Sequence, residues 1–276
     1  MPILRNDARA ILSPADVAEL VVKPIERESI PGRCATTISM SGPSLRVPRV
    51  AADPSAAWVE EGAEIAASDA VFDEITAESK KVAGLVVISR ELAEDSSPSA
   101  AEEVGRGLTR DISRQVDRAF VGDLAAPAVK GLASLTTATT VAAGSSWTSV
   151  DPMVDAIAAS ASVGGNISHW LVSASDYTSL RKVKVSTGSN QQLLAADAGG
   201  GVQIEGRPVI VSPDLEAGVV WGIDSSRVIF AIREGAEVIA DSSVYFSSDR
   251  VAVRATMRLT WAFSHPEALV KIVTTP

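Results

Sequence analysis

The sequence predicts an α+β fold in which one long helix packs on a sheet formed largely by the end of the chain. Three patterns support this prediction. Residues 98–121 show helical apolar periodicity, residues 251–263 alternate apolar and polar side chains, and residues 151–182 alternate helix and strand patterns. The chain of 276 residues is 46% hydrophobic and 21% charged, so it can bury the core of one large domain or two ordinary ones.

The helix predicted over 98–121 has two chemically different faces. At about 100° per residue, its apolar side chains share one side: Val104, Leu108, Ile112, Val116, Ala119 and Phe120. Arginines spaced four positions apart share the other side: Arg106, Arg110, Arg114 and Arg118. We expect the apolar face to lie on a sheet and the cationic face to meet solvent or an anionic partner. Local ion pairs, such as Glu102 with Arg106 or Arg114 with Asp117, are the alternative role for these arginines.

A short helix is predicted near the start of the chain. Ser13-Pro14 can begin it, Pro24 ends it, and Val17, Leu20 and Val21 share one face. A helix of this length is marginally stable alone. We therefore expect it to dock on a larger body, either its own domain or another subunit.

Residues 51–79 contain eight acidic residues and neither Lys nor Arg. So much charge with few bulky apolar groups favours a projecting two-stranded excursion that returns through 82–88, or a solvated surface meander. No basic residue lies between Arg49 and Lys80. We therefore expect the carboxylates of this segment to be neutralised by cations from elsewhere.

The second half of the chain is expected to alternate helices and strands. A helix is predicted over 151–163, a short buried strand over 170–173 and a helical segment over 174–182. Further strands are predicted at 206–211, 218–222, 227–232, 251–263 and 269–273. This succession is typical of a small mixed domain beside a β-rich one.

Catalytic and metal-binding patterns are missing from the sequence. It has no G-x-x-x-x-G-K-[ST], H-E-x-x-H or G-x-S-x-G motif. His169 and His265 are far apart and are interpreted as structural side chains. The single cysteine, Cys34, excludes an internal disulfide framework and is interpreted as inert packing. We expect no catalytic residue, no metal site and no cofactor.

The charge and hydropathy of the chain limit its partners. A net charge of −9 argues against a generally basic nucleic-acid-binding surface but allows a local basic face. No run approaches the roughly 20 apolar residues of a membrane span, and residues 1–10 lack an apolar signal core. We therefore expect a soluble protein that is made in the cytoplasm and has no membrane partner.

Four segments in order resemble the major capsid proteins of tailed bacteriophages, although none is specific alone. Ser89, Glu91, Leu92, Asp95 and Ser96 are similar to the family's "S-x-E-L-x-x-D-S" before its spine helix, and Asp117, Ala119 and Phe120 to the "D-x-A-F" that ends it. The segment 58–65, which begins Trp58-Val59, is similar to "W-V-x-E-G". Asp249-Arg250, Arg254 and Pro266 to Ala268 are similar to the closing "D-x-x-x-x-R…P-x-A" strands.

The resemblance implies the Hong Kong phage capsid fold and a division of the chain into an arm, a loop and two domains. The implied parts are an N-terminal arm at 1–46, an extended β-hairpin loop at 47–88, a peripheral domain at 89–146 and 238–276 with the spine helix at 98–121, and an axial α/β domain at 147–237.

The resemblance also implies a function and a set of contact residues. The family's subunits form hexamers and pentamers, close an icosahedral shell and hold packaged double-stranded DNA. This implies a non-enzymatic subunit of the virion capsid, synthesised in the bacterial host cytoplasm, with a portal and a separate scaffolding protein, or none, as partners. The candidate DNA-facing residues are the four arginines of the helix. The candidate inter-subunit residues are Val17, Leu20, Val21, Trp58, Glu60, Glu61, Glu64, Arg250, Arg254 and Arg258.

Two other functions stay open at this point. An encapsulin-type compartment shares the implied fold but encloses a cargo enzyme. A soluble α/β enzyme without a recognisable motif would need its catalytic groups assembled from unremarkable positions. Closed shells in electron micrographs would exclude the small enzyme, and neighbouring genes would separate the other two.

Overall fold

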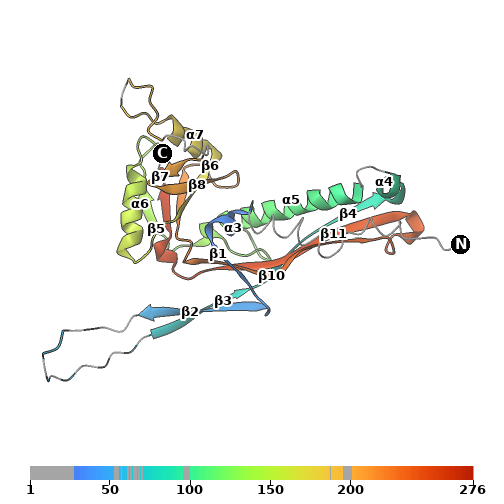
Figure 1. Ribbon diagram of the computed structural model, residues 1–276, viewed down its shortest axis with the longest axis horizontal. Coiled ribbons are helices and arrows are strands. Elements are labelled where there is room, and N and C mark those ends of the chain that lie inside the picture. Colours follow the sequence, from blue (N-terminus) through green and yellow to red (C-terminus); the bar gives the residue numbers. More distant parts are fainter. Residues whose placement is uncertain are drawn as a thin grey trace.

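The computed structural model describes residues 28–52, 71–95, 100–186, 188–194 and 201–275, and also 56, 58–60, 62, 64, 67 and 69. The molecule is elongated (Figure 1). A long helix lies along a narrow sheet, a compact α/β region occupies one end, and a hairpin projects away from the body. The protein therefore has the mixed α+β architecture that the sequence predicts.

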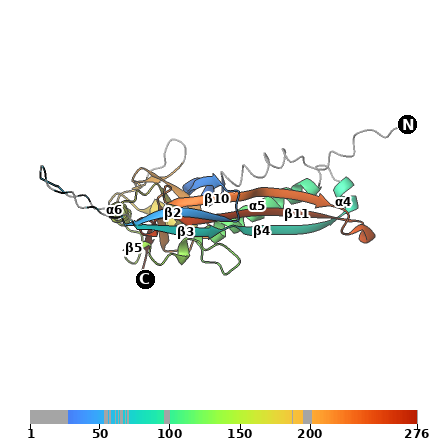
Figure 2. The same cartoon turned by 90° about the horizontal axis from the view of Figure 1, so that it is seen from below.

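A four-stranded sheet forms the long part of the body. Its strand order is β1 (Thr36–Ser39), β10 (Val228–Asp241), β11 (Arg250–Phe263) and β4 (Lys80–Ser89). β11 is antiparallel to both of its neighbours, and β1 is parallel to β10. Figure 2 shows β10, β11 and β4 side by side along the length of the molecule. The alternation predicted for 251–263 is confirmed between Val253 and Leu259, where every second residue is buried, but from Leu259 to Ala262 every residue is buried.

The long helix α5 (Ala100–Val121) confirms the helix predicted over 98–121. Ile112, Val116 and Phe120 are almost completely buried. Phe120 meets the edge of the Trp261 ring at a centroid distance of 5.5 Å. Aromatic side chains bury large areas, and edge-to-face pairs add further stabilisation, so this contact fixes the end of α5 on the sheet.

Two glycines allow α5 to approach the sheet closely. A Cβ atom on Gly84 of β4 would lie 2.8 Å from Leu108 Cδ2, and one on Gly105 would lie 3.3 Å from Val238 Cγ1. Both distances are shorter than ordinary van der Waals contacts. The helix propensity that Gly105 loses, roughly 1 kcal/mol, is thus offset by close packing on β10.

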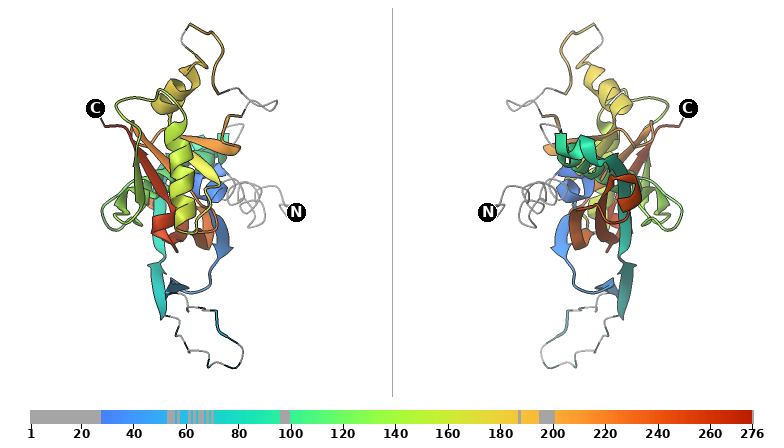
Figure 3. Two further views of the ribbon diagram at one scale, coloured as in Figure 1. Left: turned by 90° about the vertical axis from the view of Figure 1, so that its left-hand side faces the viewer. Right: turned by 90° about the vertical axis from the view of Figure 1, so that its right-hand side faces the viewer.

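A six-stranded sheet forms the compact end of the molecule. In order, its strands are β5 (Thr139–Ala142), β12 (Val270–Val273), β9 (Val219–Ile223), β6 (His169–Ser173), β8 (Arg207–Ser212) and β7 (Gln203–Ile204). The helices α6 (Asp151–Ser162) and α7 (Ala174–Lys182) lie in this part (Figure 3). Both helices and the strand between them confirm the pattern predicted for 151–182.

The core continues across both faces of the six-stranded sheet. Trp170 packs on one face with Met153 of α6 and Leu180 of α7. Trp221, on the other face, joins the cluster that contains Val116 and Phe120 of α5. One buried apolar cluster therefore connects the compact end to the long helix.

The projecting hairpin consists of β2 (Ser44–Ala52) and β3 (Val71–Glu78), which pair antiparallel from Ser44–Glu78 to Ala52–Val71. It extends from the body on the side opposite α7 (Figure 3). The predicted excursion was placed too far along the chain. Residues 82–88 do not return through the hairpin, because β4 pairs with β11 over ten residues from Lys80 to Ser89.

The sheets also divide the chain differently from the predicted boundaries. β5 and β12 fall in ranges assigned to the peripheral domain, yet β12 joins β5 to β9 of the six-stranded sheet. Residues 228–237 fall in the range assigned to the axial domain, yet β10 pairs with β11 from Val228 onwards. The reason is that the partner strands are far apart in sequence, so local patterns do not reveal them.

Short elements complete the described chain. They are α3 (Ile30–Cys34), α4 (Arg90–Asp95), and the 3-10 turns η2 (Leu132–Ser134), η3 (Phe246–Ser248) and η4 (Pro266–Ala268).

Candidate assembly surfaces

The four arginines of α5 lie on its exposed side, opposite the buried apolar residues. We call Arg106, Arg110, Arg114 and Arg118 the cationic helix face. Glu103 partly neutralises it, since its carboxylate oxygens lie 3.8 Å from Arg106 Nη1 and 3.3 Å from Arg110 Nη2. These pairs are exposed and contribute at most about 1 kcal/mol each.

The alternative role considered for these arginines included an ion pair between Arg114 and Asp117. In the structure, Asp117 makes a different contact. Its Oδ1 atom accepts a hydrogen bond from the backbone N–H of Ile30 at 2.7 Å. The carboxyl group therefore faces the segment that enters α3 rather than the cationic helix face. The side chain of Glu102, the other expected partner, lies outside the described residues.

The four-stranded sheet has one face that α5 does not cover. Ile239 of β10, Arg254 of β11 and Leu85 of β4 are cross-strand neighbours on this face. Val87 follows two residues after Leu85. We call these four side chains the open sheet face. Leu85 is 58% exposed, and Ile239 and Val87 are 38% and 36% exposed.

The other two predicted arginines of β11 lie on the same side of the sheet. Arg258 already has a partner in its own chain, since its Nε atom lies 3.4 Å from Glu234 Oε2. Arg250 is exposed at the start of the strand. Arg254 is exposed and, after two stronger hydrogen bonds from Ser243, contributes to lowering the pKa of Asp241. Of the three arginines predicted to lie between subunits, Arg254 is the one that lies among the apolar side chains of the open sheet face.

The far end of the hairpin carries the predicted residues Trp58, Glu60 and Glu64. Trp58 is fully exposed, Val59 is 41% exposed, and both glutamates are exposed. Glu61 lies outside the described residues, as do Val17, Leu20 and Val21 of the predicted short helix. An exposed tryptophan beside an exposed valine is a feature of binding surfaces.

The expectation that the carboxylates of 51–79 lack local cations is wrong for β3. Arg49 of β2 pairs with Asp73 at 2.9 Å, and Arg46 pairs with Glu74 at 3.4 Å. Lys80 pairs with Glu78 at 2.7 Å and lowers the pKa of that carboxyl. The antiparallel register places Arg49 opposite Asp73 and Arg46 diagonally from Glu74, which the linear sequence does not show.

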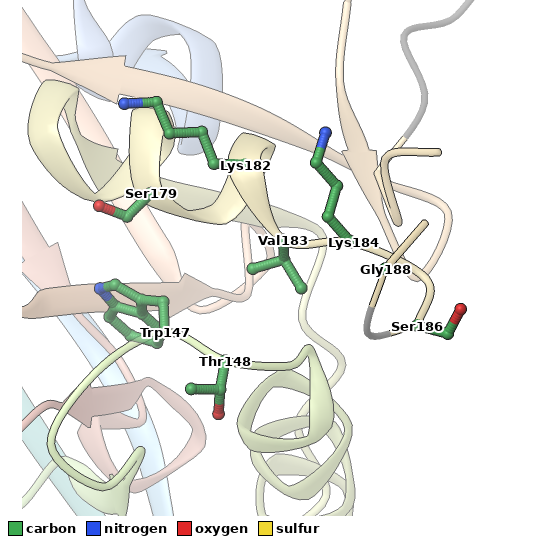
Figure 4. A pocket seen from close by; sticks show the side chains of 8 residues that line it. All are labelled: Trp147, Thr148, Ser179, Lys182, Val183, Lys184, Ser186 and Gly188. Atoms are coloured by element: carbon green, nitrogen blue, oxygen red, sulfur yellow. The ribbon is translucent and has the colours of Figure 1, made fainter. Parts of the chain in front are cut away.

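An open hollow of about 520 Å³ lies between α7 and the residues before α6 (Figure 4). It is lined by Trp147, Thr148, Ser179, Lys182, Val183, Lys184, Ser186 and Gly188. The lining has hydroxyl and ammonium groups but no carboxylate, imidazole or thiol. Lys184 Nζ donates to the Asn190 carbonyl at 3.1 Å. The hollow therefore lacks the acid–base pairs with which hydrolases activate a hydroxyl.

Neither histidine belongs to a catalytic arrangement in the described residues. His169 Nδ1 lies 2.9 Å from Ser168 Oγ, and His265 Nε2 lies 3.1 Å from the Val163 carbonyl. Burial, and secondly Arg33, lower the pKa of His169. Within the described part of the chain, no group of His, Cys, Asp and Glu side chains could hold a metal ion. Likewise, none of the described helices is long and apolar enough to cross a membrane.

Comparison with known proteins gives one family and a consistent set of structures. The model of the phage capsid family matches residues 10–274. A chain from Microbacterium phage Oxtober96 aligns with a TM-score of 0.75 and 19% identity, covering 96% of this chain and 99% of that one. A chain from Mycobacterium phage Adephagia aligns with a TM-score of 0.73 and 18% identity, covering 88% of each. A chain from the capsid of a native GTA (gene transfer agent) particle aligns with a TM-score of 0.72 and 18% identity, covering 100% of this chain and 93% of that one. No curated protein matches.

The family match and the likeness to capsid structures define a structural subunit that associates with copies of itself, not an enzyme. The chain belongs to the phage capsid family. It is a major capsid protein that forms an icosahedral shell, and its place is the virion capsid. These matches do not favour an encapsulin-type compartment or a motif-less enzyme.

Proposed function

We propose that the protein forms hexamers and pentamers that close a phage head around double-stranded DNA. The proposal includes synthesis in the cytoplasm of a bacterial host, and a portal and a separate scaffolding protein as assembly partners. The observation that carries it is the hairpin β2–β3, which projects from the body and ends near a fully exposed tryptophan. A two-stranded hairpin is marginally stable alone, so this one gains stability by lying on another copy.

The open sheet face of a neighbouring copy has the chemistry to receive this hairpin. Leu85, Val87 and Ile239 offer apolar area to the Trp58 ring, and Arg254 lies between two of them in the cross-strand row. A guanidinium over an indole ring is attracted by the ring's quadrupole. Glu60 and Glu64 carry charge opposite to that of Arg250 and Arg254. The pairing therefore combines an apolar anchor with complementary charges.

Cysteine trapping tests this contact directly. Cys34 is completely buried, and burial raises its pKa to about 12, so it does not compete for disulfide formation. The double variant Trp58→Cys with Leu85→Cys should give disulfide-linked oligomers in assembled particles on non-reducing gels. The matched control is Trp58→Cys with Val154→Cys, because Val154 is exposed on α6, away from the sheet. Equal linking in both variants, or none in either, would contradict the contact.

The short helix predicted from Pro14 to Val22 is assigned to the same assembly. We propose that Val17, Leu20 and Val21 contact another subunit, because a helix with one apolar face is marginal alone. Deleting residues 1–23 should leave a folded subunit that assembles poorly. Particles of normal number and shape from this truncation would count against the assignment.

DNA is the proposed partner of the cationic helix face. Arginine binds phosphate without reading bases, and each neutralised phosphate contributes a log–log salt slope of roughly −0.9. Replacing the four arginines with glutamine should leave assembly intact and reduce DNA retention at raised salt. Lys182→Gln with Lys184→Gln, in the exposed hollow, is the control. A cationic helix face that lies against protein or outside the shell would exclude this role.

A further inference from the structure

β4 forms one edge of the four-stranded sheet and is paired on one side only. Its partner strand is β11, which it follows without a register shift from Lys80 to Ser89. In the described part of the chain, the backbone of residues 82–88 hydrogen-bonds with no strand other than β11. Figure 2 shows β4 along the margin of the sheet. Every second residue of this strand therefore turns its backbone N–H and C=O away from the sheet.

The edge lacks the features by which proteins usually protect such strands. Charged side chains, prolines, bulges and short length discourage an edge from pairing with another chain. Residues 82–88 include no charged residue and no proline, and the pairing with β11 has no bulge. The opposite edge, β1, is only four residues long. An open, regular and largely aliphatic edge of this length is therefore suited to pairing with a further strand.

The two ends of β4 carry exposed charges of opposite sign. Lys81 lies at its start, and Glu91 follows its end in α4. The adjacent Lys80 is already paired with Glu78 of its own chain. A parallel copy of β4 would place like charges side by side, whereas an antiparallel copy places Lys81 of one chain beside Glu91 of the other. Charge complementarity therefore favours a second copy of this strand in the antiparallel orientation.

The exposed side chains of β4 favour one register. If Val86 pairs with Val86 of the second copy, Leu85 of each chain lies opposite Val87 of the other. Leu85 is 58% exposed and Val87 is 36% exposed, so each gains an aliphatic cross-strand partner. The same register brings Lys81 level with Glu91 of the other chain. A register centred one residue to either side moves these two charges two positions apart.

We propose that β4 pairs with β4 of a second copy about a two-fold axis at Val86, so that the two four-stranded sheets continue as one. Such a contact is isologous, because the same strand contributes on both sides. It goes beyond the proposed hexamers and pentamers, since a two-fold contact joins copies in pairs. It is also separate from the hairpin contact, which covers a face of the sheet rather than its edge.

A single cysteine on the proposed axis tests the pairing. Directly opposed side chains of an antiparallel pair have Cβ atoms about 4.5–5.5 Å apart, close to the separation found in disulfides. Val86→Cys should therefore give disulfide-linked dimers, and nothing larger, when assembled particles are oxidised and run on non-reducing gels. The matched control is Val82→Cys, a half-buried valine on the same face of the same strand, which should stay monomeric. Cys34 is completely buried and does not compete.

Charge reversal provides a second measurement of the same contact. In the Val86→Cys variant, Lys81→Glu or Glu91→Lys alone should slow linking several-fold, because each change brings like charges together. The two changes combined should restore the rate, since opposite charges then face each other again. Monomer alone in Val86→Cys, equal linking in Val82→Cys, or no rescue by the combined reversal would overturn the proposal.

Hydrogen exchange separates failure of this contact from failure of the proposed assembly. The amides of residues 82–88 that do not bond to β11 should become protected when subunits assemble. Protection without linking through Val86→Cys would mean that a different strand covers the edge, and the two-fold pairing would be wrong. Unprotected amides in closed shells would also contradict the pairing, yet would leave the hairpin contact, which Trp58 probes, unaffected.

Discussion

The tryptophans of the compact end and of the hairpin have opposite environments. Trp170 and Trp221 lie on the two faces of the six-stranded sheet and are almost completely buried. Trp58, on the projecting hairpin, is fully exposed. Burying an aromatic side chain is among the largest single apolar contributions available to a chain. One region thus completes its own core, whereas the other leaves a large apolar side chain exposed.

Polar groups follow the same division. At the compact end, Asp176 is 6% exposed and accepts hydrogen bonds from Trp147 Nε1 at 2.8 Å and Gly218 N at 2.7 Å. In the hairpin, the Arg49–Asp73 pair is exposed to solvent. Buried hydrogen-bonded acids stabilise only while every partner is present, whereas exposed ion pairs contribute little. The difference indicates which substitutions affect folding and which affect assembly.

The largest effect is expected for Asp176→Ala. It would leave the half-buried donors of Trp147 and Gly218 and the buried Ser173 hydroxyl without their acceptor, and each unpaired group costs up to about 1–3 kcal/mol. We expect the free energy of unfolding of the isolated subunit to fall by roughly 3–5 kcal/mol. Denaturant titration measures it. Asp73→Ala in the hairpin is the comparison and should change the same quantity by less than about 1 kcal/mol.

The second-largest effect is expected for Trp58→Ala, which should weaken assembly without changing the stability of the free subunit. The free subunit should unfold as before, within about 0.5 kcal/mol, because surface substitutions change little. Assembly should weaken by about 2–4 kcal/mol per contact, as for a tryptophan hot spot. Light scattering against subunit concentration gives the assembly threshold. A threshold equal to that of the unmodified chain would place Trp58 outside the interface.

The smallest effect is expected for the hairpin carboxylates. Replacing Glu60, Glu61 and Glu64 with glutamine removes negative charge, worth about 0.2–1 kcal/mol for each surface ion pair that is lost. Shells should dissociate at lower denaturant in the variant, and the difference should shrink as salt increases. Isolated subunits provide the control, since their unfolding should not change. A difference that is independent of salt would point to a cause other than charge.

Patterns within one element could be predicted from the sequence, but partners far along the chain could not. The helix over 98–121 follows from the spacing of Ile112, Val116 and Phe120. The predicted hairpin extended wrongly into β4. Only Ser79 separates β3 from β4, and no turn signal in the sequence marks the point where the pairing changes from β2 to β11. The hydrogen bond that Asp117 accepts was missed because its donor, Ile30, lies 87 residues away. The local sequence instead suggested an ion pair between Asp117 and Arg114.

The proposed contact surfaces were predictable in part. Trp58 and Arg254 belong to motifs that can be found in the sequence. Leu85, Val87 and Ile239 do not, because only the strand register shows that they share a face with Arg254. Their exposure is the signal that distinguishes them from core residues of the same strands.

An electron cryomicroscopy map of assembled particles would show directly whether the hairpin of one copy lies on the sheet of another. The map should show Trp58 of one subunit buried on Leu85, Ile239 and Arg254 of its neighbour, with the body of each subunit unchanged. A Trp58 side chain that stays exposed in the closed shell, or an open sheet face covered by a different segment, would contradict the account.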